Sequence, residues 1–109
     1  MNPVLFLAQR ATAGVLAVAV GVHLATILYA AQQGLTAAAI LGRTRGNLLF
    51  LAFYVVFVLA AAIHAPIGLR TVLREWSGRS GRGIDAALVA FACVIAILGL
   101  RAAYGLFAI

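Results

Sequence analysis

The stretch that decides the fold is residues 47–73, which read NLLFLAFYVVFVLAAAIHAPIGLRTVL. No charged side chain occurs between Asn47 and Arg70. A helix needs about 20 predominantly apolar residues to cross the hydrocarbon core of a bilayer. This run is therefore long enough to span a membrane as one helix.

Two similar runs flank this stretch, at residues 4–31 and 86–108. The first is too long for the apolar part of a signal peptide, and Arg10 lies inside it rather than in front, so we expect a retained helix. Between the runs, residues 35–41 form an apolar patch that predicts an interfacial helix with Thr36 as its cap. Residues 77–83 form a flexible basic turn, and Asp85 is expected to cap the third helix. The prediction is three membrane helices, at about 4–31, 47–73 and 86–108, with an interfacial segment at 35–41.

Composition supports this fold class over the whole chain, 1–109. Of the 109 residues, 66% are hydrophobic and 9% are charged, with mean hydropathy +1.16. Soluble domains are about half apolar and about a quarter charged, and a chain this small cannot bury so much apolar surface within itself. The single Cys93 excludes a disulfide framework and a Cys-based metal site within the chain. We therefore predict an all-α integral membrane protein with one domain.

The net charge of +6 does not indicate nucleic acid, because all eight basic residues are arginines at the ends of apolar runs. Cytoplasmic loops carry the excess of arginine. One side of the membrane would hold five of them and the other side three: Arg10, Arg70, Arg74, Arg79 and Arg82 against Arg43, Arg45 and Arg101. We expect a cytoplasmic N-terminus and a C-terminus on the opposite side.

Two histidines, His23 and His64, lie inside the apolar runs. Intramembrane ionisable residues are rare and usually functional, and a neutral imidazole is a good axial ligand for heme iron. The alternative is a histidine that only bonds a neighbouring helix. Gly68, one turn after His64, leaves room for a flat macrocycle. Arg70 and Arg74 follow at the boundary, where they suit heme propionates or lipid headgroups.

A family pattern accompanies these residues. The first helix carries RATAGV at residues 10–15, and the second carries His64-x-x-x-Gly68-x-Arg70 with Glu75 eleven residues after the histidine. With three helices over essentially the whole chain, this resembles the membrane-anchor cytochrome b subunits of succinate dehydrogenase and fumarate reductase. The resemblance implies that His64 is an axial ligand of heme b.

The same resemblance implies a quinone pocket at the cytoplasmic ends of the first two helices. Arg10 matches the quinone-site arginine, Glu75 the acidic residue, and Trp76 the place of a quinone-contacting tyrosine. Where the family has a serine and a histidine before the arginine, this chain has Phe6 and Gln9. Thr12 or Trp76 is then expected to supply the missing hydrogen bond.

The two histidines differ in expected depth. His23 lies 13 residues beyond Arg10, or about 20 Å, and His64 lies 6 residues before Arg70, or about 9 Å. A separation of about 10 Å makes one heme shared by both unfavourable. We expect His64 to share its heme with a histidine from another chain, and His23, if it is a ligand, to serve a second, deeper heme.

The predicted function is a non-catalytic electron-transfer subunit of a succinate dehydrogenase or fumarate reductase complex in a bacterial-type inner membrane. It would bind heme b and quinone and dock an iron–sulfur subunit, a flavoprotein subunit, and a second anchor chain or a second copy of itself. No Gly-rich flavin-binding motif is present. Alternatives are a b-type cytochrome anchor of another dehydrogenase and a structural anchor without heme. A small transporter is disfavoured because Glu75 and Asp85 lie at helix ends.

Overall fold

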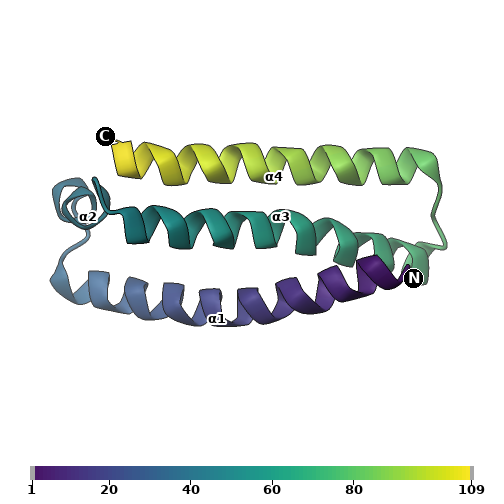
Figure 1. Ribbon diagram of the computed structural model, residues 1–109, viewed down its shortest axis with the longest axis horizontal. Coiled ribbons are helices and arrows are strands. Elements are labelled where there is room, and N and C mark those ends of the chain that lie inside the picture. Colours follow the sequence, from purple (N-terminus) through teal and green to yellow (C-terminus); the bar gives the residue numbers. More distant parts are fainter. Residues whose placement is uncertain (1, 109) are drawn as a thin grey trace.

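The computed structural model describes residues 2–108, which form four helices (Figure 1). They are α1 (Pro3–Gln33), α2 (Ala37–Thr44), α3 (Leu48–Ser77) and α4 (Arg82–Ala108). Three of them, α1, α3 and α4, are long and apolar enough to cross a membrane. The described residues contain no strand. The predicted all-α class with three membrane-spanning helices is confirmed.

Local sequence signals explain where the helices begin. The Asn2 side chain accepts a hydrogen bond from the Val4 amide at 2.8 Å, and the Thr36 hydroxyl accepts one from the Ala39 amide at 3.1 Å. Such caps satisfy amides that have no partner inside the helix. The predicted Thr36 cap is confirmed. Helix α3 ends at Gly78, whose left-handed backbone conformation (φ 69°) favours glycine.

The helices run past the apolar runs at several ends. Helix α3 continues to Ser77, and α4 begins at Arg82. Charged side chains end the apolar pattern without ending the backbone hydrogen bonds of a helix, so hydropathy underestimates helix length. As a result Asp85 lies in the first turn of α4, and the predicted N-cap role of Asp85 is wrong. A carboxylate in the first turn is still favourable, because the N-terminus of a helix carries partial positive charge.

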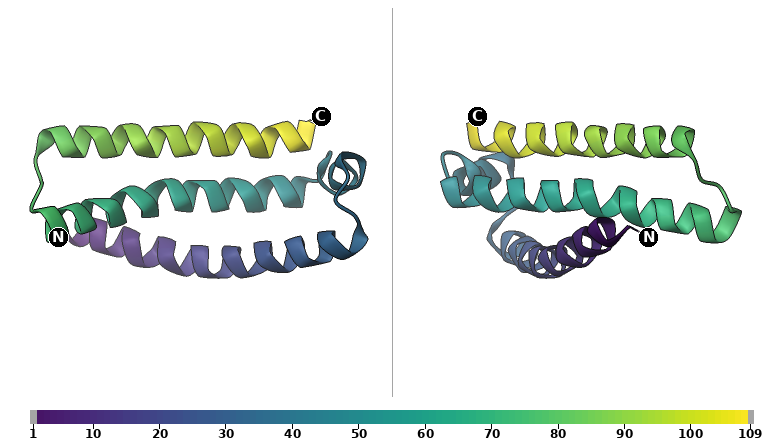
Figure 2. Two further views of the ribbon diagram at one scale, coloured as in Figure 1. Left: turned by 180° about the vertical axis from the view of Figure 1, so that it is seen from behind. Right: turned by 45° about the vertical axis from the view of Figure 1, so that its right-hand side comes forward.

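Helix α3 lies between α1 and α4 and packs against both (Figures 1 and 2). The start of α1, the end of α3 and the start of α4 share one end of the molecule. The short α2 crosses the other end, where the Thr44 hydroxyl donates to the Leu106 carbonyl of α4 at 3.0 Å. The arrangement is a row of three antiparallel helices rather than a closed bundle.

Close packing in this row depends on small residues. The buried apolar residues are Ala19, Ala60, Ala62, Leu88 and Ala103. A Cβ on Gly99 of α4 would lie only 2.5 Å from Cγ1 of Val58 on α3, so the two backbones approach closely there. Most large apolar side chains are exposed. Within an 18-residue apolar stretch of each span, only 6% to 11% of the residues are buried. Lipid or other chains must cover these outer faces.

Pro66 lies inside α3 without ending it. Figure 1 shows the part of α3 after the middle bending toward the start of α1. Proline has no amide hydrogen and its ring crowds the preceding turn, so a bend follows. The bend brings the last turns of α3 to the end of the molecule where the charged residues gather.

Candidate functional site

The first candidate site joins His64 on α3 to Thr12 on α1. The Nδ1 atom of His64 lies 3.2 Å from the Thr12 hydroxyl oxygen. Thr12 is buried, and its hydroxyl also lies 2.7 Å from the Ala8 carbonyl and 3.2 Å from the Gln9 carbonyl of its own helix. Threonine in a helix commonly bonds back to the preceding turn in this way. Thr12 therefore fixes one nitrogen of a histidine that lies inside a membrane span.

Gln9 and Gly68 extend this contact by one turn toward the helix end. A Cβ on Gly68 would lie 3.2 Å from Gln9 Nε2, so the glycine leaves room for the glutamine side chain. Gln9 Oε1 is buried and has no hydrogen-bond partner within residues 2–108. A buried acceptor without a donor is costly, which suits a group contributed from outside the chain.

The His64 surroundings fit a heme ligand. The histidine is half-buried, its Nδ1 has a partner, and no hydrogen bond involves its Nε2 within residues 2–108. Within residues 2–108, the one buried side-chain polar atom without a hydrogen-bond partner is Gln9 Oε1. His64 Nε2 also has no partner there, so it is not fully buried. Iron-ligating histidines characteristically bond the protein through the other ring nitrogen.

The second candidate site joins His23 on α1 to Tyr54 on α3. The Nδ1 atom of His23 lies 2.6 Å from the Tyr54 hydroxyl oxygen. The rings of Tyr54 and Phe57 both meet the imidazole edge to face, at 5.5 Å and 5.6 Å between ring centroids. This pair borders an apolar cavity of about 450 Å³ between α1, α3 and α4, near the end that holds α2.

The two sites lie at different depths. His23 is level with Tyr54, which lies ten residues before His64 on α3. Ten residues correspond to about 15 Å along a helix. The expected difference in depth is confirmed and is larger than the sequence estimate, because α1 and α3 are offset along the bundle.

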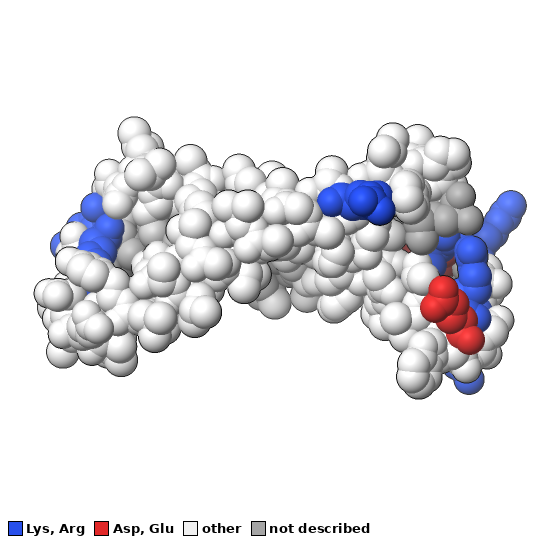
Figure 3. All heavy atoms as spheres, turned by 90° about the horizontal axis from the view of Figure 1, so that it is seen from below, with Lys and Arg blue, Asp and Glu red and all other residues white. Residues whose placement is uncertain are grey.

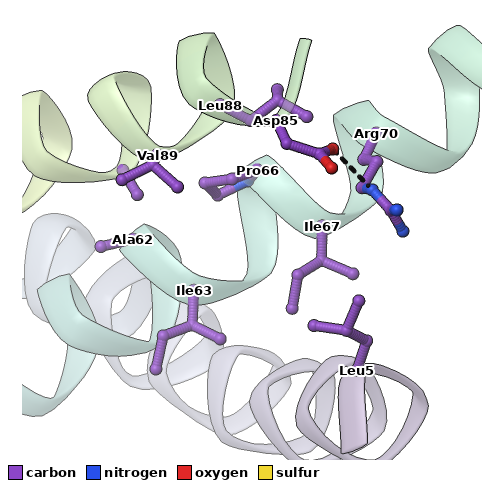
Figure 4. A pocket seen from close by; sticks show the side chains of 10 residues that line it. Leu5, Ala62, Ile63, Pro66, Ile67, Arg70, Asp85, Leu88 and Val89 are labelled. Atoms are coloured by element: carbon purple, nitrogen blue, oxygen red, sulfur yellow. Dashed lines mark hydrogen bonds and ion pairs between the residues drawn. The ribbon is translucent and has the colours of Figure 1, made fainter. Parts of the chain in front are cut away.

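Arg70 is held by an acidic partner on the next helix. Its Nε donates to an Asp85 carboxylate oxygen at 3.0 Å (Figure 4). Both residues line a cavity of about 380 Å³ that is otherwise apolar and includes Leu5 and Pro66. Ile67 and Leu5 point into the space between α1 and α3 in this view. Arg74 is exposed one turn further along α3.

The structure does not bring the predicted quinone residues together. Arg10 is exposed and its guanidinium carbon lies 5.6 Å from the centre of the Phe6 ring, while Thr12 is buried against His64. Glu75 and Trp76 are exposed at the end of α3, with Trp76 86% exposed. Thr12 is level with His64. Toward the same end of the molecule, Arg10 lies two residues from Thr12 and Glu75 lies eleven residues from His64, so Arg10 and Glu75 are separated by about 14 Å along the helix axes.

Sequence reasoning missed three features of these sites: the buried Oε1 atom of the half-buried Gln9, Asp85 as the partner of Arg70, and Tyr54. Tyr54 stands in a row of aromatic residues that looks like lipid-facing packing in the sequence. Its role depends on its level relative to His23 along the helices, which the sequence alone does not give. For Asp85 the sequence did contain a signal. A short basic turn brings the acidic residue that follows it back beside the end of the preceding helix, where Arg70 lies.

Charge is distributed toward the two ends of the molecule. On the face drawn in Figure 3, basic atoms lie at one end, and basic and acidic atoms lie together at the other end, where α3 meets α4, with one basic patch set inward from that end. This is the pattern of a membrane protein whose charged residues lie in or beside the headgroups. Residues 2–108 contain no group of three or more His, Cys, Asp or Glu side chains that would hold a metal ion. An iron held here would need its further ligands from a macrocycle and another chain.

Comparison with known proteins identifies a family. No curated protein and no solved structure matched the chain significantly. A family model described as "Succinate dehydrogenase/Fumarate reductase transmembrane subunit" matches residues 2–99. The matched region includes α1, α2 and α3, both histidines and most of α4. The chain therefore belongs to the transmembrane subunits of succinate dehydrogenase and fumarate reductase.

Proposed function

We propose that this subunit binds heme b and quinone and passes electrons between the iron–sulfur subunit of its complex and the quinone pool of the membrane. Family membership supports a role in a multi-subunit succinate dehydrogenase or fumarate reductase. It also favours this reading over an anchor of another dehydrogenase.

One observation carries the heme assignment. His64 lies inside a membrane span, has one ring nitrogen bonded to a buried hydroxyl, and has the other nitrogen unpartnered within residues 2–108. Bound heme would supply a one-electron carrier within the membrane. The chain's own contribution is to orient the imidazole through Thr12 and to exclude water with apolar helix faces. Arg70 and Arg74 are the candidates for the propionates, and Gly68 for packing against the macrocycle.

One intramembrane histidine at this depth implies that the other axial ligand comes from a neighbouring chain. A second anchor subunit or a second copy of this subunit would supply it. The exposed apolar faces of all three spans support such a neighbour, because the row of helices leaves both sides open. The sequence also predicts His23, at its separate depth, as the ligand of a second heme. Its 2.6 Å contact with the Tyr54 hydroxyl supports the alternative, a histidine that bonds the neighbouring helix, so we propose heme at His64 only.

The quinone assignment concerns the end of the molecule where α1 begins and α3 ends. Arg10, Glu75 and Trp76 are exposed there, and Thr12 lies deeper. Exposed residues can contact a docked subunit, so we propose that the iron–sulfur subunit completes the quinone pocket against them. The flavoprotein would carry the dicarboxylate chemistry. The arginine distribution supports an inner-membrane location with this end in the cytoplasm.

Purification of the complex from membranes tests the proposal. We expect the flavoprotein and iron–sulfur subunits to co-purify with this chain, and the dithionite-reduced complex to show the absorption bands of a b-type heme. Co-purification without any Soret band would contradict heme binding and leave a structural anchor.

A further inference from the structure

We infer that two hydroxyl groups hold the two intramembrane histidines in opposite tautomers, so that His64, and not His23, offers a free Nε2 lone pair to iron. Thr12 is then the positioning residue of the site. The inference rests on the proposed function, because it concerns how the chain prepares its ligand for heme.

The Thr12 hydroxyl has one hydrogen to donate. Its shortest contact is the Ala8 carbonyl oxygen at 2.7 Å, and a carbonyl oxygen only accepts. The hydroxyl hydrogen is therefore used within α1, and the hydroxyl oxygen is left to accept from His64. The distance of 3.2 Å to His64 Nδ1 lies within the range of an N–H···O bond. His64 thus carries its hydrogen on Nδ1, which leaves a lone pair on Nε2.

The Tyr54 hydroxyl is in a different position. No carbonyl or other acceptor lies within hydrogen-bond distance of it in residues 2–108 apart from His23. A phenol is the stronger donor and an imidazole nitrogen the stronger acceptor of the two groups. The separation of 2.6 Å is shorter than N–H···O bonds usually are but normal for an O–H donor. Tyr54 therefore donates to His23 Nδ1, and His23 carries its hydrogen on Nε2.

The consequence is a division between the two histidines. His64 presents an electron pair and has its Nδ1–H bonded to an oxygen, which raises the basicity of the ligand. His23 presents an N–H, and it cannot bind iron through Nε2 without changing tautomer and reversing the direction of the Tyr54 hydrogen bond. The hydrogen bond between His23 and Tyr54 instead joins α1 to α3 beside an apolar cavity.

The test compares variants of the purified complex by heme content and heme midpoint potential. T12V keeps the side-chain shape and removes the acceptor, whereas T12S keeps the hydroxyl. We expect T12V to bind heme about 10- to 100-fold more weakly and to have a higher midpoint potential, because a less basic ligand stabilises the oxidised iron less. T12S should match the unmodified complex. T12C, a weaker acceptor of similar size, should fall between them, and it carries the test if T12V does not assemble.

Two outcomes separate this inference from the proposed function. If H64A loses its heme but T12V and T12C match T12S in potential and heme content, the positioning role of Thr12 is wrong and the heme assignment stands. If H64A keeps its heme, the proposed function itself fails. H23A should keep the full heme content, and loss of one heme per complex would overturn the tautomer assigned to His23.

Discussion

Arg70 and Asp85 form an ion pair that joins the last turns of α3 to the first turn of α4, with 3.0 Å between the arginine Nε and a carboxylate oxygen. The pair stands beside the short connection between the two helices, at the end of the molecule that holds most of the charge. Its side chains are 31% and 49% exposed, so it lies at a boundary rather than in the apolar interior.

Because the pair is partly exposed, we expect it to contribute little to stability. D85N should lower the free energy of unfolding in detergent by no more than about 1 kcal/mol. A double-mutant cycle with R70Q, measured by denaturant titration, should give a coupling energy in the same range. A coupling of several kcal/mol would mean that the pair is desolvated in the assembled complex.

The close approach of α3 and α4 should depend on Gly99. G99A places a methyl group 2.5 Å from Val58 Cγ1, and a β-branched side chain in a helix has little freedom to move. Overpacking of this kind costs about 1–3 kcal/mol. Thermal unfolding in detergent should show the loss and its recovery in G99A/V58A. G21A on α1, where a Cβ would meet nothing within 4 Å, is the matched control and should not destabilise the protein.

The His23–Tyr54 bond should stabilise the contact between α1 and α3. Y54F removes the hydroxyl and keeps the ring, so we expect a loss of about 0.5–1.5 kcal/mol in the free energy of unfolding. Y29F serves as the control, because Tyr29 is exposed on α1. Equal stability of Y54F and Y29F would show that the bond contributes nothing.

The arginine distribution predicts the orientation of the chain. In a C93A background, S80C lies in the connection between α3 and α4, and T36C lies before α2 at the other end. A membrane-impermeant maleimide should label T36C in cells with a permeabilised outer membrane, and S80C only after the inner membrane is opened. Labelling with the two sites exchanged would reverse the proposed topology.

The helices could be predicted from the sequence because lipid imposes a simple requirement, an uninterrupted apolar run of sufficient length. Their exact ends could not, since helical hydrogen bonding continues through Glu75 and Arg82. His64 and His23 stood out because imidazoles are rare in such runs. Their hydroxyl partners did not, because a threonine and a tyrosine are ordinary in a membrane helix. Only the register of α1 against α3 places Thr12 beside His64 and Tyr54 beside His23.

Two rows of small residues, one on α4 and one on α1, show the same limit of prediction from sequence. Gly99, which follows Ala92 and Ala96 on α4 at a looser spacing of four and then three residues, packs closely against α3. Ala13, Ala17 and Gly21 on α1 follow one another at a regular spacing of four residues, yet they are exposed. Spacing indicates that a close contact is possible, but the neighbour that makes it depends on how the three helices are arranged.

The central claim is that His64 holds heme iron, and the reduced-minus-oxidised difference spectrum of the purified complex tests it most directly. H64A should lose the b-type α and Soret bands while the flavoprotein and iron–sulfur subunits remain bound, and T26A on the exposed face of α1 should keep them. An assembled H64A complex with the full heme signal of the unmodified complex would contradict the account.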